Sequence, residues 1–195
     1  MLENIEIDYF NSNDSDIEKI AKLYCMTFLT DNILLEDKEN AVKNIRKHTG
    51  YEGFIGLKCK DAKGKLIGFA YGYTSLSKQF YREKIANQLS DDKIDFWLAD
   101  CFEFVELAVN HSYKRLGVAS KLHDELLANT NCGTAVLTTA IKNKPALNLY
   151  KKKGWEVIKK DAPIISKDNL QVIMGKVLNG NHFNFPEQYK YKNET

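Results

Sequence analysis

A nine-residue apolar segment, Cys101–Val109, runs directly into a basic turn and then into an amphipathic helix. Its only charged residues are Glu103 and Glu106. An apolar run of this length predicts a strand buried inside a sheet. Apolar residues at helical spacing then predict a helix over Leu116–Ala128: Val118, Ala119, Leu122 and Leu126. A buried strand, a basic turn and an amphipathic helix in this order restrict the fold classes that the chain can adopt.

The rest of the chain alternates between strand and helix patterns. We expect strands at Ile5–Phe10, Phe54–Cys59, Leu66–Tyr73, Thr134–Thr138, Trp155–Ile158 and Leu170–Val177, with a hairpin turn at Asp61–Gly64. We expect a helix after Ser15, and others at Glu39–Lys47, Ser77–Asp92 and Pro145–Lys152. Hairpin and crossover connections both occur, so the expected fold class is α/β, a mixed central sheet flanked by helices.

No internal repeat or linker of small polar residues divides the 195 residues. We therefore expect one domain over residues 1–178 and a C-terminal tail, 179–195, whose order is in doubt. A net charge of +2 with interspersed signs argues against a nucleic-acid partner, and Lys151–Lys153 is read as a solvated helix end. No signal peptide or membrane-spanning run is evident, which favours a cytoplasmic protein without a membrane partner. The four cysteines and four histidines are not clustered, so no metal site is expected.

The turn before the second element carries Lys114, Arg115 and Gly117. The first N–H groups of a helix lack internal partners and lie at its positive dipole end, where they bind phosphate groups. Glycine allows an anion to approach the backbone. Neither the P-loop pattern nor the dinucleotide fingerprint is present. Without further information, a plain helix start that happens to be basic explains the turn as well.

The segment Lys114–Ala119 resembles the [QR]-x-x-G-x-[GA] acetyl-CoA signature of the GNAT superfamily of N-acetyltransferases. It departs from the pattern at Lys114, which keeps the positive charge but loses the planar contacts of arginine. The resemblance implies a single-domain GNAT-like fold with acetyl-CoA as cosubstrate. It places the coenzyme against Leu107, Ala108, Val109, Lys114, Arg115, Leu116, Gly117, Val118, Ala119 and Ser120.

A second segment, Asn143–Trp155, is similar to the family pattern N-x-x-A-x-x-x-Y-x-x-x-G-[FW]. The resemblance implies that Asn143, Ala146 and Tyr150 line the pantetheine arm, and that Tyr150 protonates the departing thiolate. A phenol is protonated at neutral pH and can act as an acid. The alternatives left open are a core tyrosine at 150 and a helix-capping asparagine at 143.

Acetyl transfer to an amine needs a group that removes the amine's proton, and the strand offers Glu103 and Glu106. These two point to opposite faces of a regular strand, so only a bulge brings both into one cleft. We favour Glu103, where some relatives carry a glutamate base; either glutamate could instead pair with a cation or face solvent. A carboxylate buried here needs a partner or has a raised pKa.

The acceptor pocket is expected between the early helices and the Ser77–Trp97 segment, with aromatic walls and nearby acids: Phe80, Tyr81, Phe96, Trp97, Asp91, Asp92 and Asp95. Packing and surface roles are the alternative for these residues. The leading hypothesis is transfer of an acetyl group to a primary amine of a small molecule or peptide by direct attack in a ternary complex. A non-catalytic acyl-CoA-binding module and a ligand-free interaction domain are the alternatives, and a homodimer is left open.

Overall fold

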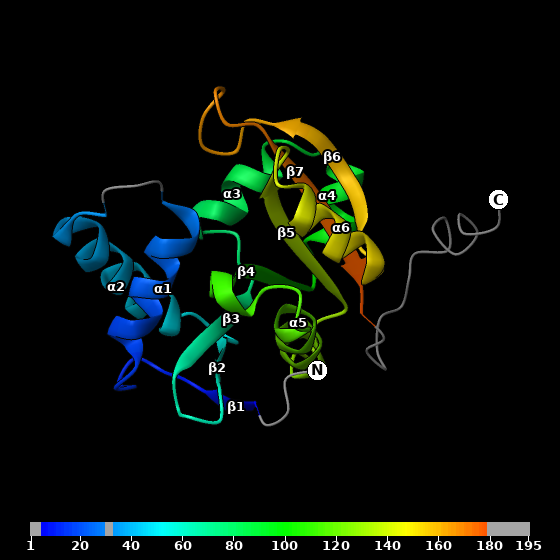
Figure 1. The fold of residues 1–195 in the computed structure, drawn as a ribbon. Helices are drawn as coiled ribbons and strands as arrows, with labels where there is room; N and C mark the ends of the chain where they lie inside the picture. Colours follow the sequence, from blue (N-terminus) through cyan, green and yellow to red (C-terminus); the bar gives the residue numbers. More distant parts are fainter. Residues whose placement is uncertain (1–4, 30–32, 179–195) are drawn as a thin grey trace.

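The computed structural model describes residues 5–29 and 33–178. Seven strands form one sheet in the order β1-β2-β3-β4-β5-β7-β6 (Figure 1). Neighbouring strands are antiparallel except for β4 and β5, which are parallel. The strands are β1 Glu6–Tyr9, β2 Ile55–Lys60, β3 Leu66–Thr74, β4 Cys101–Val109, β5 Thr134–Ala140, β6 Glu156–Ala162 and β7 Gln171–Val177. The expected mixed α/β sheet is confirmed.

Helices cover both faces of the sheet (Figure 1). On one face, α5 and α6 pack over a core that includes Leu122, Phe104 and Met174. On the other face, α1 lies on β3 and β4 with α2 packed against it, while α3 and α4 cover the half of the sheet around Val136 and Ile173. The bounds are α1 Ile17–Phe28, α2 Leu35–Thr49, α3 Phe80–Ala86, α4 Asp91–Trp97, α5 Val118–Ala128 and α6 Lys144–Lys152, with a 3-10 turn at His111–Tyr113.

The single helix expected over Ser77–Asp92 is wrong. The chain forms α3, ends it at Asn87, and begins α4 after Ser90. Phe80, the first residue of α3, is 54% exposed. Asparagine and serine compete for backbone hydrogen bonds and favour helix ends over helix interiors. Apolar residues do recur at helical spacing in this segment, but the mostly polar residues 87–90 separate the two helices.

Other expected bounds differ by a few residues. Helix α2 begins at Leu35, four residues before the expected Glu39, and Asp37 accepts a hydrogen bond from the Leu34 N–H at its start. Helix α5 begins at Val118 because Gly117 adopts a left-handed φ of 87°. The tail expected to begin at residue 179 lies outside the described residues.

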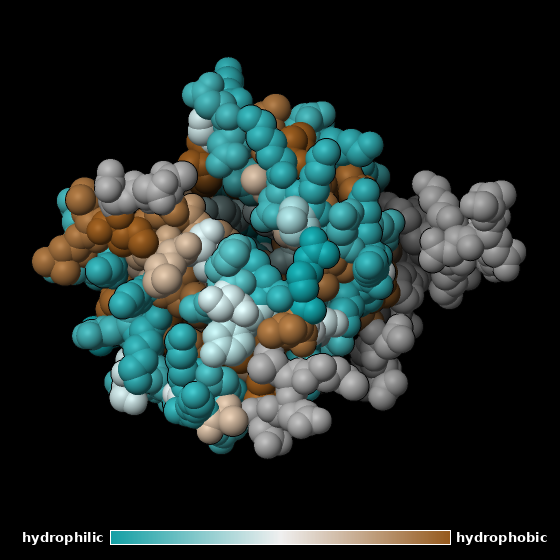
Figure 2. Space-filling view, viewed as in Figure 1, coloured by the Kyte–Doolittle hydropathy of each residue, from teal (hydrophilic) through white to brown (hydrophobic). Residues whose placement is uncertain are grey.

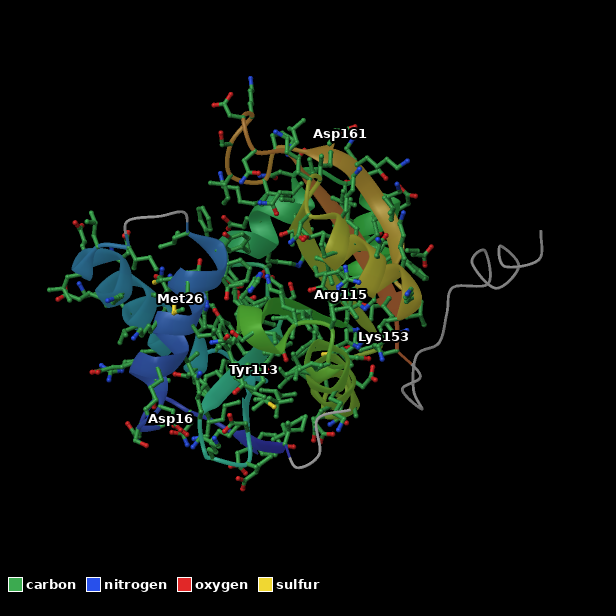
Figure 3. The ribbon with its side chains drawn as sticks, in the orientation of Figure 1. Asp16, Met26, Tyr113, Arg115, Lys153 and Asp161 are labelled. Carbon is green, nitrogen blue, oxygen red and sulfur yellow. The ribbon has the colours of Figure 1, made fainter. Side chains whose placement is uncertain are left out.

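An ion network joins the start of α1 to β2. Asp16 is 2% exposed and lies 3.1 Å from Lys58 and 2.7 Å from Lys60, while Asp14 lies 2.6 Å from Lys58. Hydrogen bonds from Lys19 and Lys60 are the main cause of an Asp16 pKa well below its usual range. Figure 3 labels Asp16 at this end of α1. The network fixes α1 against the sheet, and the other end of α1 contributes to the site.

All four cysteines are free and buried. A buried free cysteine behaves as a small apolar side chain. Within the described part of the chain, no helix is long and apolar enough to cross a membrane.

Candidate active site between two splayed strands

Strands β4 and β5 pair only at their beginnings. Cys101–Glu103 lie beside Thr134–Val136, and the ladder stops there. Beyond this point the strands separate around a cleft of about 350 Å³. Figure 2 shows the surface hollowed between the α1 side and the α5–α6 side. Its lining comes from α1, α3, β4, β5, the N-cap of α6 and the start of β7 with the segment before it: Tyr24, Phe28, Tyr81, Ile85, Glu103, Phe104, Val105, Glu106, Leu137, Thr138, Thr139, Ala140, Asn143, Asn169 and Gln171.

A β-bulge in β4 brings both glutamates to this cleft. In the ladder with β3, Glu106 stands opposite Tyr71, but the next pair is Gly72 with Phe104, so Val105 is the extra residue. An extra residue shifts the alternation of side chains by one position. Glu106 therefore joins Glu103 at the cleft instead of facing away from it. The sequence indicated that only a bulge could bring both glutamates into one cleft, and β4 contains such a bulge.

Glu103 is held in place by two hydroxyl groups. Tyr73 donates to Oε1 and Ser75 donates to Oε2, each at 3.3 Å, and the residue is 4% exposed. Burial raises the pKa of Glu103 to about 7, and the two hydroxyl donors and the charge of Arg82 oppose the rise. Glu103 is therefore a buried, fixed carboxyl group that titrates near neutrality.

Glu106 is half-buried and lacks such donors. No described group donates a hydrogen bond to its carboxylate, which lines the cleft. Burial alone raises the pKa of Glu106 to about 8. Its charge also contributes to the raised pKa values of Tyr24, Tyr81 and Tyr150. An unpaired carboxylate at the cleft surface can accept a proton from a bound molecule.

Tyr150 lies on α6, which covers the face of the sheet opposite to the face covered by α1. It is buried to 8% exposure, and its ring contacts Phe104, a cleft residue, edge to face at a centroid distance of 6.0 Å. Burial, and second the charge of Glu106, raise the pKa of its phenol well above the usual value. The phenol is thus protonated, and within the described residues its hydroxyl has no hydrogen-bond partner. Both features suit a proton donor, and the packing also shows that Tyr150 is part of the core.

A buried hydrogen bond fixes α6 against α5. Trp155 Nε1 donates to His123 Nε2 at 2.8 Å, which leaves Nδ1 as the protonated nitrogen facing Asp124 at 2.9 Å. Asp124 also pairs with Lys153 at the end of α6. These contacts hold the helix that carries Tyr150 at a set position beside β4.

The turn ahead of α5 presents free backbone donors. The N–H groups of residues 115–120 bond to no acceptor in the described chain. Gly117 sits at the N-cap with φ 87°, and Arg115 also has a positive φ, 65°. A side chain at 117 would meet no protein atom within 4 Å, so glycine serves the backbone conformation and leaves the space in front of it open. Lys114, Arg115 and Leu116 are exposed beside these donors.

Two contacts brace this turn. The Tyr113 hydroxyl donates to Asp61 Oδ2 at 2.7 Å, and the Lys65 ammonium lies 5.7 Å from the centre of the Tyr113 ring. Asp61 belongs to the β2–β3 hairpin, so the turn is tied to the sheet. Figure 3 labels Tyr113 and Arg115 in this region. The arrangement holds a row of donors ready for an anion.

The remaining candidates occupy defined places. Asn143 caps α6, since its Oδ1 accepts from the Ala146 N–H at 3.3 Å, and it also lines the cleft. The two readings of Asn143 are therefore compatible. Val118 is buried, Ala119 and Ser120 are half-buried in the first turn of α5, and Leu107, Ala108 and Val109 follow the bulge on β4. Of these residues Asn143 is in the cleft lining, while Val118, Ala119 and Ser120 begin α5 directly after the donor turn.

Sequence reasoning missed part of the lining. Phe28, Thr138, Thr139, Asn169 and Gln171 line the cleft, but none had been named as a site residue. Their signal is weak, because alternation in a strand does not show where its neighbour diverges. Of the expected acceptor residues Tyr81 lines the cleft, whereas Trp97 packs in the core and the three aspartates of α4 are not in the lining. Among the residues described, no group of three or more His, Cys, Asp or Glu could hold a metal ion.

The family model described as the acetyltransferase (GNAT) family matches residues 17–155. The chain belongs to this family. The matched region includes α1, the bulged strand, the donor turn and α6, so most of the site of this GNAT protein lies within it, while the lining residues Asn169 and Gln171 lie beyond it. No curated protein sequence matches it significantly.

Solved structures share the fold of this GNAT protein at low sequence identity. NAA60 of Arabidopsis thaliana, in complex with acetyl-CoA, is similar with a TM-score of 0.65 and 18% identity, covering 91% of this chain and 100% of that one. The ribosomal-protein-S18-alanine N-acetyltransferase of Escherichia coli is similar with a TM-score of 0.63 and 14% identity, covering 94% and 99%. At these identities the likeness shows the fold alone.

Proposed function

We propose that this protein transfers the acetyl group of acetyl-CoA to a primary amine of a small molecule or peptide by direct attack in a ternary complex. One observation carries the proposal: the carboxyl group of Glu106 lines the cleft and the phenol ring of Tyr150 packs against the cleft residue Phe104, and neither polar group has a hydrogen-bond partner among the described residues. A transfer between thioester and amine needs one proton removed and one proton supplied.

The donor turn fits the coenzyme. Six consecutive N–H groups, from Arg115 to Ser120, have no acceptor in the described part of the chain, and Lys114 and Arg115 add positive charge beside them. A diphosphate is the anion that such a helix start accommodates. Beyond Glu103, β4 has no strand on its β5 side, so residues around Leu107–Val109 offer backbone groups to the pantetheine arm and the acetyl carbonyl. Asn143 and Ala146 lie at the α6 side of the same splay.

In the proposed reaction, Glu106 accepts a proton from the acceptor ammonium. The neutral amine nitrogen then attacks the thioester carbonyl carbon, and backbone N–H groups of β4 stabilise the negative oxygen. As the carbon–sulfur bond breaks, the phenol of Tyr150 gives its proton to the sulfur, and the second proton that the nitrogen loses as the amide forms restores the phenol through solvent. An amide and free coenzyme A are the products.

We assign the base to Glu106, although the sequence favoured Glu103. Glu103 is enclosed by Tyr73 and Ser75, and its oxygens are already occupied by their hydroxyl groups. Glu106 reaches the cleft with its oxygens unpaired. A proton acceptor must come within hydrogen-bond distance of the amine, and Glu106 satisfies that condition more directly.

The activity named for one structure with this fold agrees with the proposed amine acetylation. The Escherichia coli structure with this fold is an N-acetyltransferase of a ribosomal protein, and the NAA60 structure contains acetyl-CoA. The second candidate, a non-catalytic acyl-CoA-binding module, needs the donor turn but has no use for Glu106 and Tyr150. Cytoplasmic location and a homodimer stay predictions.

Two measurements test the proposed function. Calorimetric titration with coenzyme A tests the turn, and release of free thiol from acetyl-CoA in the presence of polyamines, aminoglycosides, amino acids and peptides tests the chemistry. Thiol release that depends on an added amine supports the transferase. Coenzyme binding without release with any amine supports the module, and folded protein that binds no coenzyme rules out both.

A further inference from the structure

Exposed apolar side chains gather beside the mouth of the cleft. They lie at the end of α1, the start of α2 and the segment that enters α3, and their exposed fractions run from 40% at Leu29 to 72% at Leu35. Figure 2 shows the apolar colour concentrated on this α1–α2 side. We call this group the apolar rim: Met26, Phe28, Leu29, Leu34, Leu35, Leu76 and Phe80. A contiguous apolar surface of this kind marks a binding region.

The apolar rim is continuous with the cleft at two points. Phe28 belongs to both, and its ring lies 5.1 Å from that of Tyr24, another cleft residue. On α3, the ring of Phe80 packs edge to face against the cleft residue Tyr81 at 5.6 Å. A molecule whose reacting group lies near Glu106 can therefore extend onto the rim without crossing a polar surface.

The charges of the cleft restrict what the reacting end can be. Among the described residues, the lining contains two carboxyl groups, Glu103 and Glu106, and no lysine, arginine or histidine. Their pKa values are about 7 and 8, so a cationic amine finds opposite charge there at slightly alkaline pH. A molecule with a carboxylate close to its amine finds no cation in the lining and meets like charge, which costs free energy in a partly desolvated site.

Resting on the proposed amine acetylation, we infer that the acceptor is a primary amine on an uncharged apolar body, which lies on the apolar rim while the amine meets Glu106. The cleft selects the charge of the reacting end, and the rim selects the body. Free amino acids and polyamines are disfavoured, because each places a second charge where the site offers apolar surface or like charge.

The experiment uses four acceptors with the same six-carbon chain and different far ends: hexylamine, 6-amino-1-hexanol, 1,6-hexanediamine and 6-aminohexanoate. Thiol release from saturating acetyl-CoA is measured for each with the full-length protein. Each methylene buried on the rim raises kcat/KM by about fourfold. We therefore expect hexylamine to exceed the diamine and the amino acid by at least about tenfold, with the amino alcohol between them, and octylamine to exceed hexylamine.

Phe28→Ser tests whether the rim is responsible. It is expected to reduce the preference for hexylamine over the diamine to less than about threefold while leaving affinity for coenzyme A unchanged. Tyr9→Ser is the matched control: Tyr9 is 59% exposed but lies on β1, away from the cleft lining, and the preference should persist.

The outcomes separate this inference from the proposed function. Equal rates with all four acceptors, or faster transfer to the diamine or the amino acid, overturn the acceptor class but leave the transferase standing. No release with any amine, in protein that binds coenzyme A, overturns both. A preference that survives Phe28→Ser unchanged overturns the role of the rim.

Discussion

Glu106 stands directly opposite Tyr71 in the β3–β4 ladder, whereas Gly72, the next residue of β3, stands opposite Phe104. The one-residue shift between these pairs decides which face of the sheet carries Glu106. Gly72 lies beside this shift, and the surrounding atoms leave no room for a side chain at that position. A Cβ there would overlap the carbonyl oxygen of Glu103 and the ring of Phe102.

Gly72→Ala should therefore destabilise the protein by about 1–3 kcal/mol, because the strands must move apart to admit the methyl group. Denaturant unfolding measures this change. Gly50→Ala is the control, since the nearest atom to its Cβ would be a carbonyl oxygen at 3.4 Å, and its effect should stay within about 1 kcal/mol. Equal stabilities of the two variants would show that the bulge tolerates a side chain.

Glu106→Gln should lower kcat by about 10²–10⁴-fold and change the pH profile. The pKa of Glu106 is about 8, and a base works only when deprotonated, so the rate of the unmodified protein should rise with pH up to about 8 and then level. The glutamine variant should lose this rising limb of the rate–pH profile. Rate–pH profiles at saturating acetyl-CoA measure both effects.

Glu103→Gln is the comparison for that experiment. Its carboxyl is bonded by Tyr73 and Ser75, so the variant should keep the limb near pH 8. If the limb instead disappears in Glu103→Gln and persists in Glu106→Gln, the base is Glu103.

Tyr150→Phe should slow turnover while coenzyme A affinity stays nearly unchanged. The phenol is protonated and unpaired, and the substitution removes its proton without removing the ring that packs on Phe104. Loss of a general acid lowers a rate by about 10²–10⁴-fold. Turnover comes from thiol release and affinity from calorimetry; unchanged turnover would remove Tyr150 from the mechanism and leave it as a core residue.

Gly117→Ala should weaken coenzyme A binding. A residue with a Cβ pays about 1–2 kcal/mol to keep φ near 87°, so the turn shifts and its free N–H groups lose their alignment. Gly64→Ala is matched, because Gly64 has φ 73°, also faces open space, and lies in the β2–β3 hairpin. Both variants should lose similar stability, but calorimetry should show weaker coenzyme binding in Gly117→Ala alone. Equal affinities would indicate that the turn does not hold the diphosphate.

Asp16→Asn should lower the free energy of unfolding by about 3 kcal/mol near neutral pH, because Lys58 loses a buried partner. The folded-state pKa of Asp16 is depressed, so its contribution is present above its unfolded pKa of about 3.9 and is lost as pH falls toward the folded value. The difference between the two proteins should therefore shrink in acid. Glu18→Gln, at an exposed position of α1, should change stability by less than about 1 kcal/mol. Urea titrations at several pH values compare the three.

The local elements and both motifs could be predicted from the sequence, because their causes are local. The apolar run predicted β4 with its observed bounds, Cys101–Val109, and apolar residues at helical spacing predicted a start of α5 at Leu116, two residues before the observed Val118. The order of the motifs and their residue types were enough to indicate the family and the coenzyme. The helix break at Asn87–Ser90 was also local, but its polar signal was weaker than the apolar spacing around it.

Only the tertiary structure showed the features of the site that depend on how neighbouring strands pair. Whether Glu106 shares a cleft with Glu103 depends on a one-residue mismatch between β4 and β3, and whether a cleft exists depends on where β5 leaves β4. Neither is encoded in one segment, since pairing register is a property of two strands together. For the same reason the apolar rim could be recognised only in the tertiary structure, because it forms where the end of α1 and the start of α3 lie beside the mouth of the cleft.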